Sequence, residues 1–141
     1  MSYSKIETFR NKNNNCPVDF TKLQEGLRTT DVMQAKGYKQ LGMTDIDGVV
    51  EYKGYVLFTE WKGTRDLPTG QRLTLEALSK NSPKQDCMQV YGETDTMKVY
   101  AYRKCKNGIW EKWVECPEGL DDYLDALSAW CDHVQEQTSK H

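Results

Sequence analysis

Residues 46–62 read IDGVVEYKGYVLFTEWK, and this stretch decides the fold. The runs 46–52 and 55–61 are rich in β-branched and aromatic residues, which favour strands. They are joined by Lys53-Gly54, which is a short turn signal. We therefore predict a β-hairpin, with the rest of a sheet built outward from it.

Helical periodicity flanks this hairpin on both sides. Apolar residues at helical spacing predict a first helix over 18–28. A second helix is expected from Thr69, its expected cap, to about Lys80. A long amphipathic stripe predicts a last helix that starts at Pro117.

Three further strands are expected. Residues 87–91 are predicted to form a short buried strand, and 98–103 and 109–114 a second hairpin joined through an Asn107-Gly108 turn. The order is then helix, strand, strand, helix, strand, hairpin and helix. It predicts an α/β fold with a central mixed β-sheet flanked by helices.

Composition limits the class of protein. The 141 residues suit a single domain over 1–141, with residues 1–16 as an irregular polar arm. Five scattered cysteines without a C-x-x-C pair, and two histidines, argue against a disulfide framework or structural zinc. No segment resembles a membrane span or a signal peptide, so we expect a cytoplasmic protein with no membrane partner. A net charge of −2 argues against holding long duplex DNA by charge alone, but it does not exclude a nuclease.

Carboxylates and an ammonium are expected to converge at one end of the first hairpin. Side chains alternate across a strand, so Glu60 and Lys62 should share one face. Antiparallel pairing brings Asp47 close to them, and Asp45 shares the face of Asp47, so either aspartate can be the first carboxylate. Asp47 is preferred because it is the aspartate nearer to the apolar pair Val49-Val50. Taken singly, each residue fits an ordinary solvated cross-strand pair. Together they suit a hard divalent cation that activates water beside a phosphate.

This pattern resembles the PD-(D/E)XK nuclease superfamily over residues 45–78. The shared features are Asp47, the E-x-K sequence at Glu60–Lys62, and Gln71 early in the following helix. The aspartate lacks the preceding proline of the motif. The resemblance implies a restriction-endonuclease-like core, dependence on Mg²⁺ or Mn²⁺, and an accessory role for Glu25 on the first helix.

The resemblance also implies a role for each residue of the site. The expected metal ligands are Asp47, Glu60, the alternative Asp45, and a carbonyl of Trp61 or Thr59. Lys62 is expected to orient the water and offset charge on the phosphate, and Gln71 to position water or phosphate.

Basic and aromatic residues interleave on the second predicted hairpin. They favour a nucleic-acid surface, with a solvated strand face over a buried aromatic face as the alternative. The candidate nucleic-acid contacts are Arg72, Lys98, Arg103, Lys104, Lys106 and Lys112.

Two hypotheses of function follow. The first is a Mg²⁺-dependent endonuclease that hydrolyses DNA, including branched or single-stranded DNA. A homodimer or a protein partner would supply specificity. The short polar chain resembles phage or mobile-element proteins, which would place it in the host cytoplasm. The second is a catalytically silent binding protein of the same fold, an inhibitor or adaptor of a nucleic-acid-processing or host-defence complex.

Overall fold

The computed structural model describes residues 22, 25 and 46–139. The chain divides into two compact units, Met1–Met43 and Thr44–His141, and each is described by itself. The expectation of one domain over the whole chain therefore stays a prediction.

In the first unit, the described residues are Lys22 and Glu25, which are helical and exposed. They fall within the helix predicted over 18–28. The predicted arm over 1–16 and the alternative carboxylate Asp45 lie outside the described residues.

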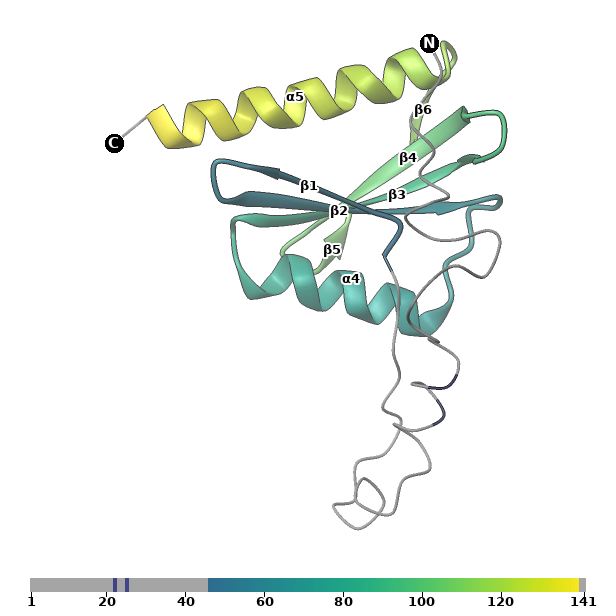
Figure 1. Cartoon of the computed structure of the whole chain (residues 1–141), viewed down its shortest axis with the longest axis horizontal. Coiled ribbons are helices and arrows are strands. Elements are labelled where there is room, and N and C mark those ends of the chain that lie inside the picture. Colours follow the sequence, from purple (N-terminus) through teal and green to yellow (C-terminus); the bar gives the residue numbers. More distant parts are fainter. Residues whose placement is uncertain (1–21, 23–24, 26–45, 140–141) are drawn as a thin grey trace. The chain divides into compact units, whose positions relative to one another are not determined.

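Within residues 46–139, six strands form one mixed sheet (Figure 1). They are β1 (Gly48–Tyr52), β2 (Tyr55–Lys62), β3 (Gln85–Glu93), β4 (Lys98–Lys106), β5 (Ile109–Trp110) and β6 (Val114–Glu115). β1 and β2 form the predicted antiparallel hairpin, β3 runs parallel to β2, and β4 runs antiparallel to β3. Both short strands, β5 and β6, pair with β4. The predicted α/β class and mixed sheet are confirmed.

Two helices cover opposite faces of this sheet, α4 (Thr69–Asn81) and α5 (Leu120–Ser139) (Figure 1). Each face has its own core. The core under α4 contains Leu75, Cys87 and Cys105, with Phe58, Leu67, Leu78 and Trp110 packed around them. The core under α5 contains Leu57, Met88, Val90, Val99, Cys116, Tyr123, Trp130 and Val134. The chain between β2 and β3 passes through α4, which places this helix beside the end of the first hairpin.

The predicted starts of both helices were wrong in detail. The N-cap residue of α4 is Pro68, and no side chain makes a capping hydrogen bond there. Thr69, which was expected to be the cap, is instead the first helical residue. α5 begins at Leu120 rather than Pro117, because Gly119 has φ of 64°, which is a left-handed conformation that an α-helix cannot contain.

The strand predicted over 109–114 is divided into β5 and β6. Cys105 pairs with Trp110, whereas Tyr102 pairs with Val114. Between these two pairs, β4 moves by three positions, from Cys105 to Tyr102, whereas the facing chain moves by four, from Trp110 to Val114. This one extra residue is a β-bulge, and it changes the face on which the following side chains lie.

Both predicted hairpin turns are confirmed by backbone geometry. Lys53 and Gly54 have φ of 51° and 84°, and Asn107 and Gly108 have φ of 52° and 77°. Two successive positive φ values are what a type I′ hairpin turn requires.

The described cysteines behave as small apolar residues. Cys87, Cys105 and Cys116 are buried, Cys131 is half-buried, and all four are free thiols. In the part of the chain that the structure describes, no helix has both the length and the apolar character needed to cross a bilayer.

Candidate active site

The α4 face of the sheet changes from apolar to polar along the strands. The apolar row consists of the register partners Phe58, Cys87 and Cys105. Two residues further on, the polar row consists of the register partners Glu60, Gln89 and Arg103. The polar row lies toward the N-terminal turns of α4, where Gln71 contacts it. The sheet therefore presents a carboxylate, an amide and a guanidinium side by side on one face.

Glu60 is the centre of the site. Only 3% of it is exposed, although it carries a carboxylate. Its Oε1 accepts a hydrogen bond of 3.1 Å from Gln71 Nε2 and lies 3.8 Å from Lys62 Nζ. Removing a carboxylate from water is costly unless hydrogen bonds and opposite charge compensate it. The structure thus brings together three of the predicted residues, one of them from the helix.

Asp47 lies at the same end of the hairpin, directly before β1. Its Oδ2 accepts a hydrogen bond of 2.8 Å from the backbone N–H of Trp61. β1 begins one residue later, at Gly48, which pairs with Thr59. Asp47 therefore takes the next position opposite Glu60, just beyond the last paired residues of the hairpin.

Trp61 contributes backbone groups to the site while its ring lies on the other face. The ring packs edge-to-face against Tyr123 of α5, with centroids 5.6 Å apart. The N–H and C=O of one residue point to the same side of a strand. Since the N–H of Trp61 points to Asp47, its carbonyl also lies on the side of Asp47.

Gln71 carries an oxygen that lacks a partner. A carboxylate can only accept hydrogen bonds, so the amide must turn Nε2 to Glu60 and Oε1 away from it. Among the described residues, Gln71 Oε1 is the one buried side-chain oxygen or nitrogen without a hydrogen bond. Leaving such a group unsatisfied costs about 1–3 kcal/mol, so a ligand that satisfies it is favoured.

These oxygens fit a hard divalent cation. Carboxylates of Asp47 and Glu60, the amide Oε1 of Gln71 and the Trp61 carbonyl are ligands that Mg²⁺ accepts. The described residues contain no group of three or more His, Cys, Asp and Glu side chains able to hold a metal. If Asp47 and Glu60 held an ion, neutral oxygens and water would have to complete its shell.

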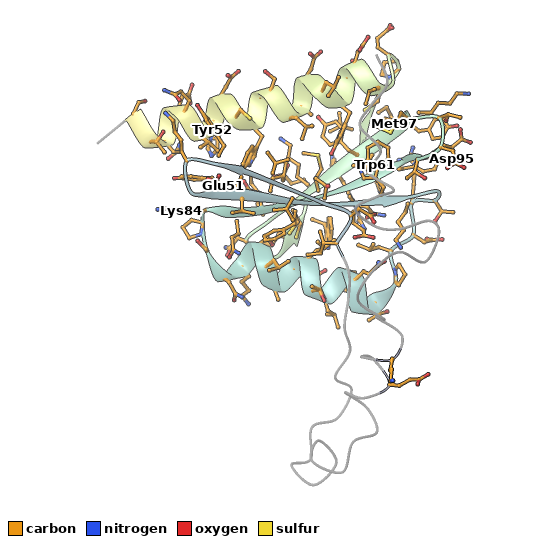
Figure 2. All side chains as sticks on the ribbon, in the orientation of Figure 1. Glu51, Tyr52, Trp61, Lys84, Asp95 and Met97 are labelled. Atoms are coloured by element: carbon orange, nitrogen blue, oxygen red, sulfur yellow. The ribbon has the colours of Figure 1, made fainter. Side chains whose placement is uncertain are left out.

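An open cleft adjoins the site at the ends of β2 and β3. Its lining residues are Trp61, Lys62, Gly63, Gly92, Glu93, Thr94, Asp95 and Thr96. Trp61 and Asp95 lie at the same end of the sheet in Figure 2, while Glu51 and Lys84 lie at the opposite end. Lys62 is therefore both a lining residue of the cleft and the cation beside Glu60.

The predicted basic contacts are placed differently from one another. Arg103 lies on the α4 face, whereas Lys104, the next residue of β4, alternates to the α5 face. Arg72 pairs with Glu76 on α4 at 3.0 Å, and Lys98 is the register partner of Glu93. Lys106 is half-buried on β4, and Lys112 is exposed between β5 and β6. Arg103 is the one of this set that belongs to the polar row.

Gln89 is a site residue that the sequence reasoning missed. It is fully buried, and its Oε1 accepts a hydrogen bond of 2.8 Å from Arg103 Nε. Its Nε2 donates to the carbonyl of Arg65 at 3.2 Å, which ties the loop after β2 to β3. A glutamine inside the stretch 87–91, which is otherwise without polar amides or charges, was the available signal, because buried amides require partners.

Comparisons of the chain with protein-family models, with curated proteins and with solved structures found no match.

Proposed function

We propose that this protein is a metal-dependent phosphodiesterase, a DNA nuclease with a PD-(D/E)XK-like, restriction-endonuclease-like core. One observation carries the proposal. The buried carboxylate of Glu60 lies beside Lys62 and Gln71, and Asp47, which precedes β1, accepts a hydrogen bond from the backbone N–H of Trp61, the residue after Glu60. Such a set of residues suits hydrolysis of a phosphodiester.

Each side chain of the site has a role that its chemistry suits. Asp47 and Glu60 would hold Mg²⁺ or Mn²⁺, with Gln71 Oε1 and the Trp61 carbonyl as neutral ligands. The chemistry such an ion supplies is a lower pKa for a bound water and neutralisation of phosphate charge. Lys62 lines the cleft and 28% of its side chain is exposed, so it could orient the attacking water and offset charge on the phosphate.

One polar atom beside Glu60 and Lys62 favours the binding of a ligand. Lys62 Nζ and Glu60 Oε1 are separated by 3.8 Å, which exceeds a good charge-assisted hydrogen bond. Gln71 Oε1 is left unsatisfied beside them. A ligand that supplies a partner to Gln71 Oε1 would remove the cost of leaving this atom unsatisfied.

A cleavage assay tests the proposal. The wild type is incubated with single-stranded, duplex and branched DNA and with RNA, in Mg²⁺, Mn²⁺ or EDTA. We expect metal-dependent cleavage, a loss of about 100-fold in Lys62→Ala, and full activity in Lys84→Ala. Lys84 is a matched control because it is an exposed lysine at the other end of the sheet (Figure 2).

Two results would count against the nuclease. Equal cleavage by wild type and Lys62→Ala would show that the activity does not come from this site. Binding of nucleic acid without cleavage of any substrate would favour the silent binding protein instead.

A further inference from the structure

Two arginines and three aromatic rings form a stacked cluster next to the polar row. Arg103 Cζ lies 4.3 Å from the ring centroid of Trp110 and 5.1 Å from that of Trp113. Arg65 Cζ lies 4.9 Å from the ring of Trp113 and 5.2 Å from that of Tyr91. Trp113 thus contacts both guanidinium groups. We call these five residues the arginine array.

The β-bulge between β5 and β6 builds this array. Trp110 pairs with Cys105 and therefore lies on the α4 face. In an unbroken strand, residues three positions apart lie on opposite faces. The extra residue cancels this alternation and lets Trp113 reach Arg103 on the same face as Trp110.

Gln89 connects the array to the candidate active site. It binds the side chain of Arg103 through Oε1 and the backbone of Arg65 through Nε2. Its register partner on the other side is Glu60. Neighbouring strands are about 4.8 Å apart, so the backbones of Glu60 and Arg103 are about 10 Å apart. A polymer with regularly spaced charges can therefore contact the Glu60 site and the Arg103 side chain at the same time.

Arg103 has spare capacity for an anion. Its Nε is bonded to Gln89, and no ion pair joins it to a carboxylate within residues 46–139. Burial is the largest cause that lowers the pKa of the half-buried guanidinium, and the nearby carboxylate of Glu76 opposes this in part. A bound anion would compensate the buried charge further, and the rings of Trp110 and Trp113 already stack on the guanidinium.

Arg65 is held by a carboxylate in the geometry that a phosphate also takes. Its Nη1 and Nη2 donate to the two oxygens of Glu115 at 3.1 and 2.8 Å. Planar bidentate pairing of this kind is common to carboxylates and phosphates. Both side chains are exposed, 41% for Arg65 and 64% for Glu115, so water can replace the pair at little cost.

We propose that the arginine array binds two phosphates of a nucleic-acid strand beside the Glu60 site, with Arg65 exchanging Glu115 for one of them. The choice of a nucleic acid over another polyanion rests on the proposed function. The chemistry recognised is the phosphodiester backbone, which DNA and RNA share.

Binding of a fluorescent oligonucleotide in EDTA tests the array without cleavage. Arg65→Gln and Arg103→Gln are each expected to weaken binding about tenfold and to lower the salt slope by about 1. Glu115→Gln is expected to tighten binding, because Arg65 is released from its carboxylate. Lys84→Gln removes one positive charge at the other end of the sheet and is expected to leave binding unchanged. Parallel DNA and RNA oligonucleotides show which strand binds more tightly.

The outcomes are separable from those of the cleavage assay. Binding by Arg65→Gln equal to that of Lys84→Gln overturns the array, even if the wild type cleaves DNA. Equal competition by polyglutamate overturns the assignment to nucleic acid. Array-dependent binding without any cleavage keeps the array and refutes the nuclease. Arg65 lies on an exposed loop, so its substitution tests the array even if Arg103→Gln unfolds the protein.

Discussion

Replacing Glu60 by glutamine is expected to stabilise the fold while abolishing cleavage. The substitution keeps an oxygen that accepts the hydrogen bond from Gln71 Nε2. It removes a negative charge that is only 3% exposed. It also adds an NH₂ group that can donate to the unsatisfied Gln71 Oε1.

The magnitude follows from the surroundings of the carboxylate. Replacing a buried ion pair by neutral groups is often neutral or stabilising by about 1–4 kcal/mol. Lys62 remains, but 28% of its side chain is exposed, so water can solvate its ammonium once the carboxylate is gone. We therefore expect a stabilisation at the lower end of this range, about 1 kcal/mol. For a folded part the size of residues 46–139, this corresponds to a rise in Tm of about 4–8 °C.

Thermal unfolding followed by circular dichroism measures this change. In EDTA the variant is expected to unfold at a higher temperature than the wild type. Saturating Mg²⁺ should reverse the order, because an ion at 100 times its Kd stabilises its own site by about 2.7 kcal/mol. Glu136→Gln, an exposed glutamate on α5, is the matched control and should respond like the wild type.

A loss of more than about 1 kcal/mol in Glu60→Gln would refute this reasoning. It would mean that the pair of Glu60 and Lys62 is a net stabilising contact of the fold. An equal gain in Tm from Mg²⁺ in the wild type and in Glu60→Gln would refute the metal assignment.

Three further predictions concern the fold around the site. Gly92→Ala is expected to destabilise the fold by about 1–3 kcal/mol in urea, because a Cβ there would collide with the backbone oxygen of Lys98. An unchanged unfolding midpoint would contradict this close approach. Trp130→Phe should cost about 1–3 kcal/mol, since the indole donates to the buried carboxylate of Asp86 at 2.9 Å; a loss below about 0.5 kcal/mol would show that this bond contributes little. Burial raises the pKa of Cys87 from 9.0 to about 12, so the thiol should resist alkylation in the native protein and react in urea. Because the unfolded thiol ionises first, this group's contribution to stability should be lost as the pH rises from about 9 to about 12.

The hairpin and the arrangement of its side chains follow from the sequence. Strand alternation is a local property, so Glu60 and Lys62 were expected on one face and Trp61 on the other, and the structure confirms this. The turn residues Lys53 and Gly54 set the register that brings Asp47 beside Trp61. The roles of these residues in metal binding and catalysis stay predictions.

Helix starts were less accurately predicted because several residues compete for the cap. Pro68 and Thr69 are both acceptable at the beginning of a helix, and only the packed geometry selects between them. Gly119 could end a loop or begin a helix, and its positive φ places it in the loop.

By itself, the sequence determined the α/β class, the first hairpin and the shared face of Glu60 and Lys62, because periodicity and turn chemistry act within a few residues. Only the tertiary structure placed Gln89 beside Glu60, since that contact depends on parallel pairing across the α4 crossover. It also produced the one-residue bulge that brings Trp113 to Arg103. Such contacts join residues distant in the chain, so their register depends on how whole strands pair, which no local pattern encodes.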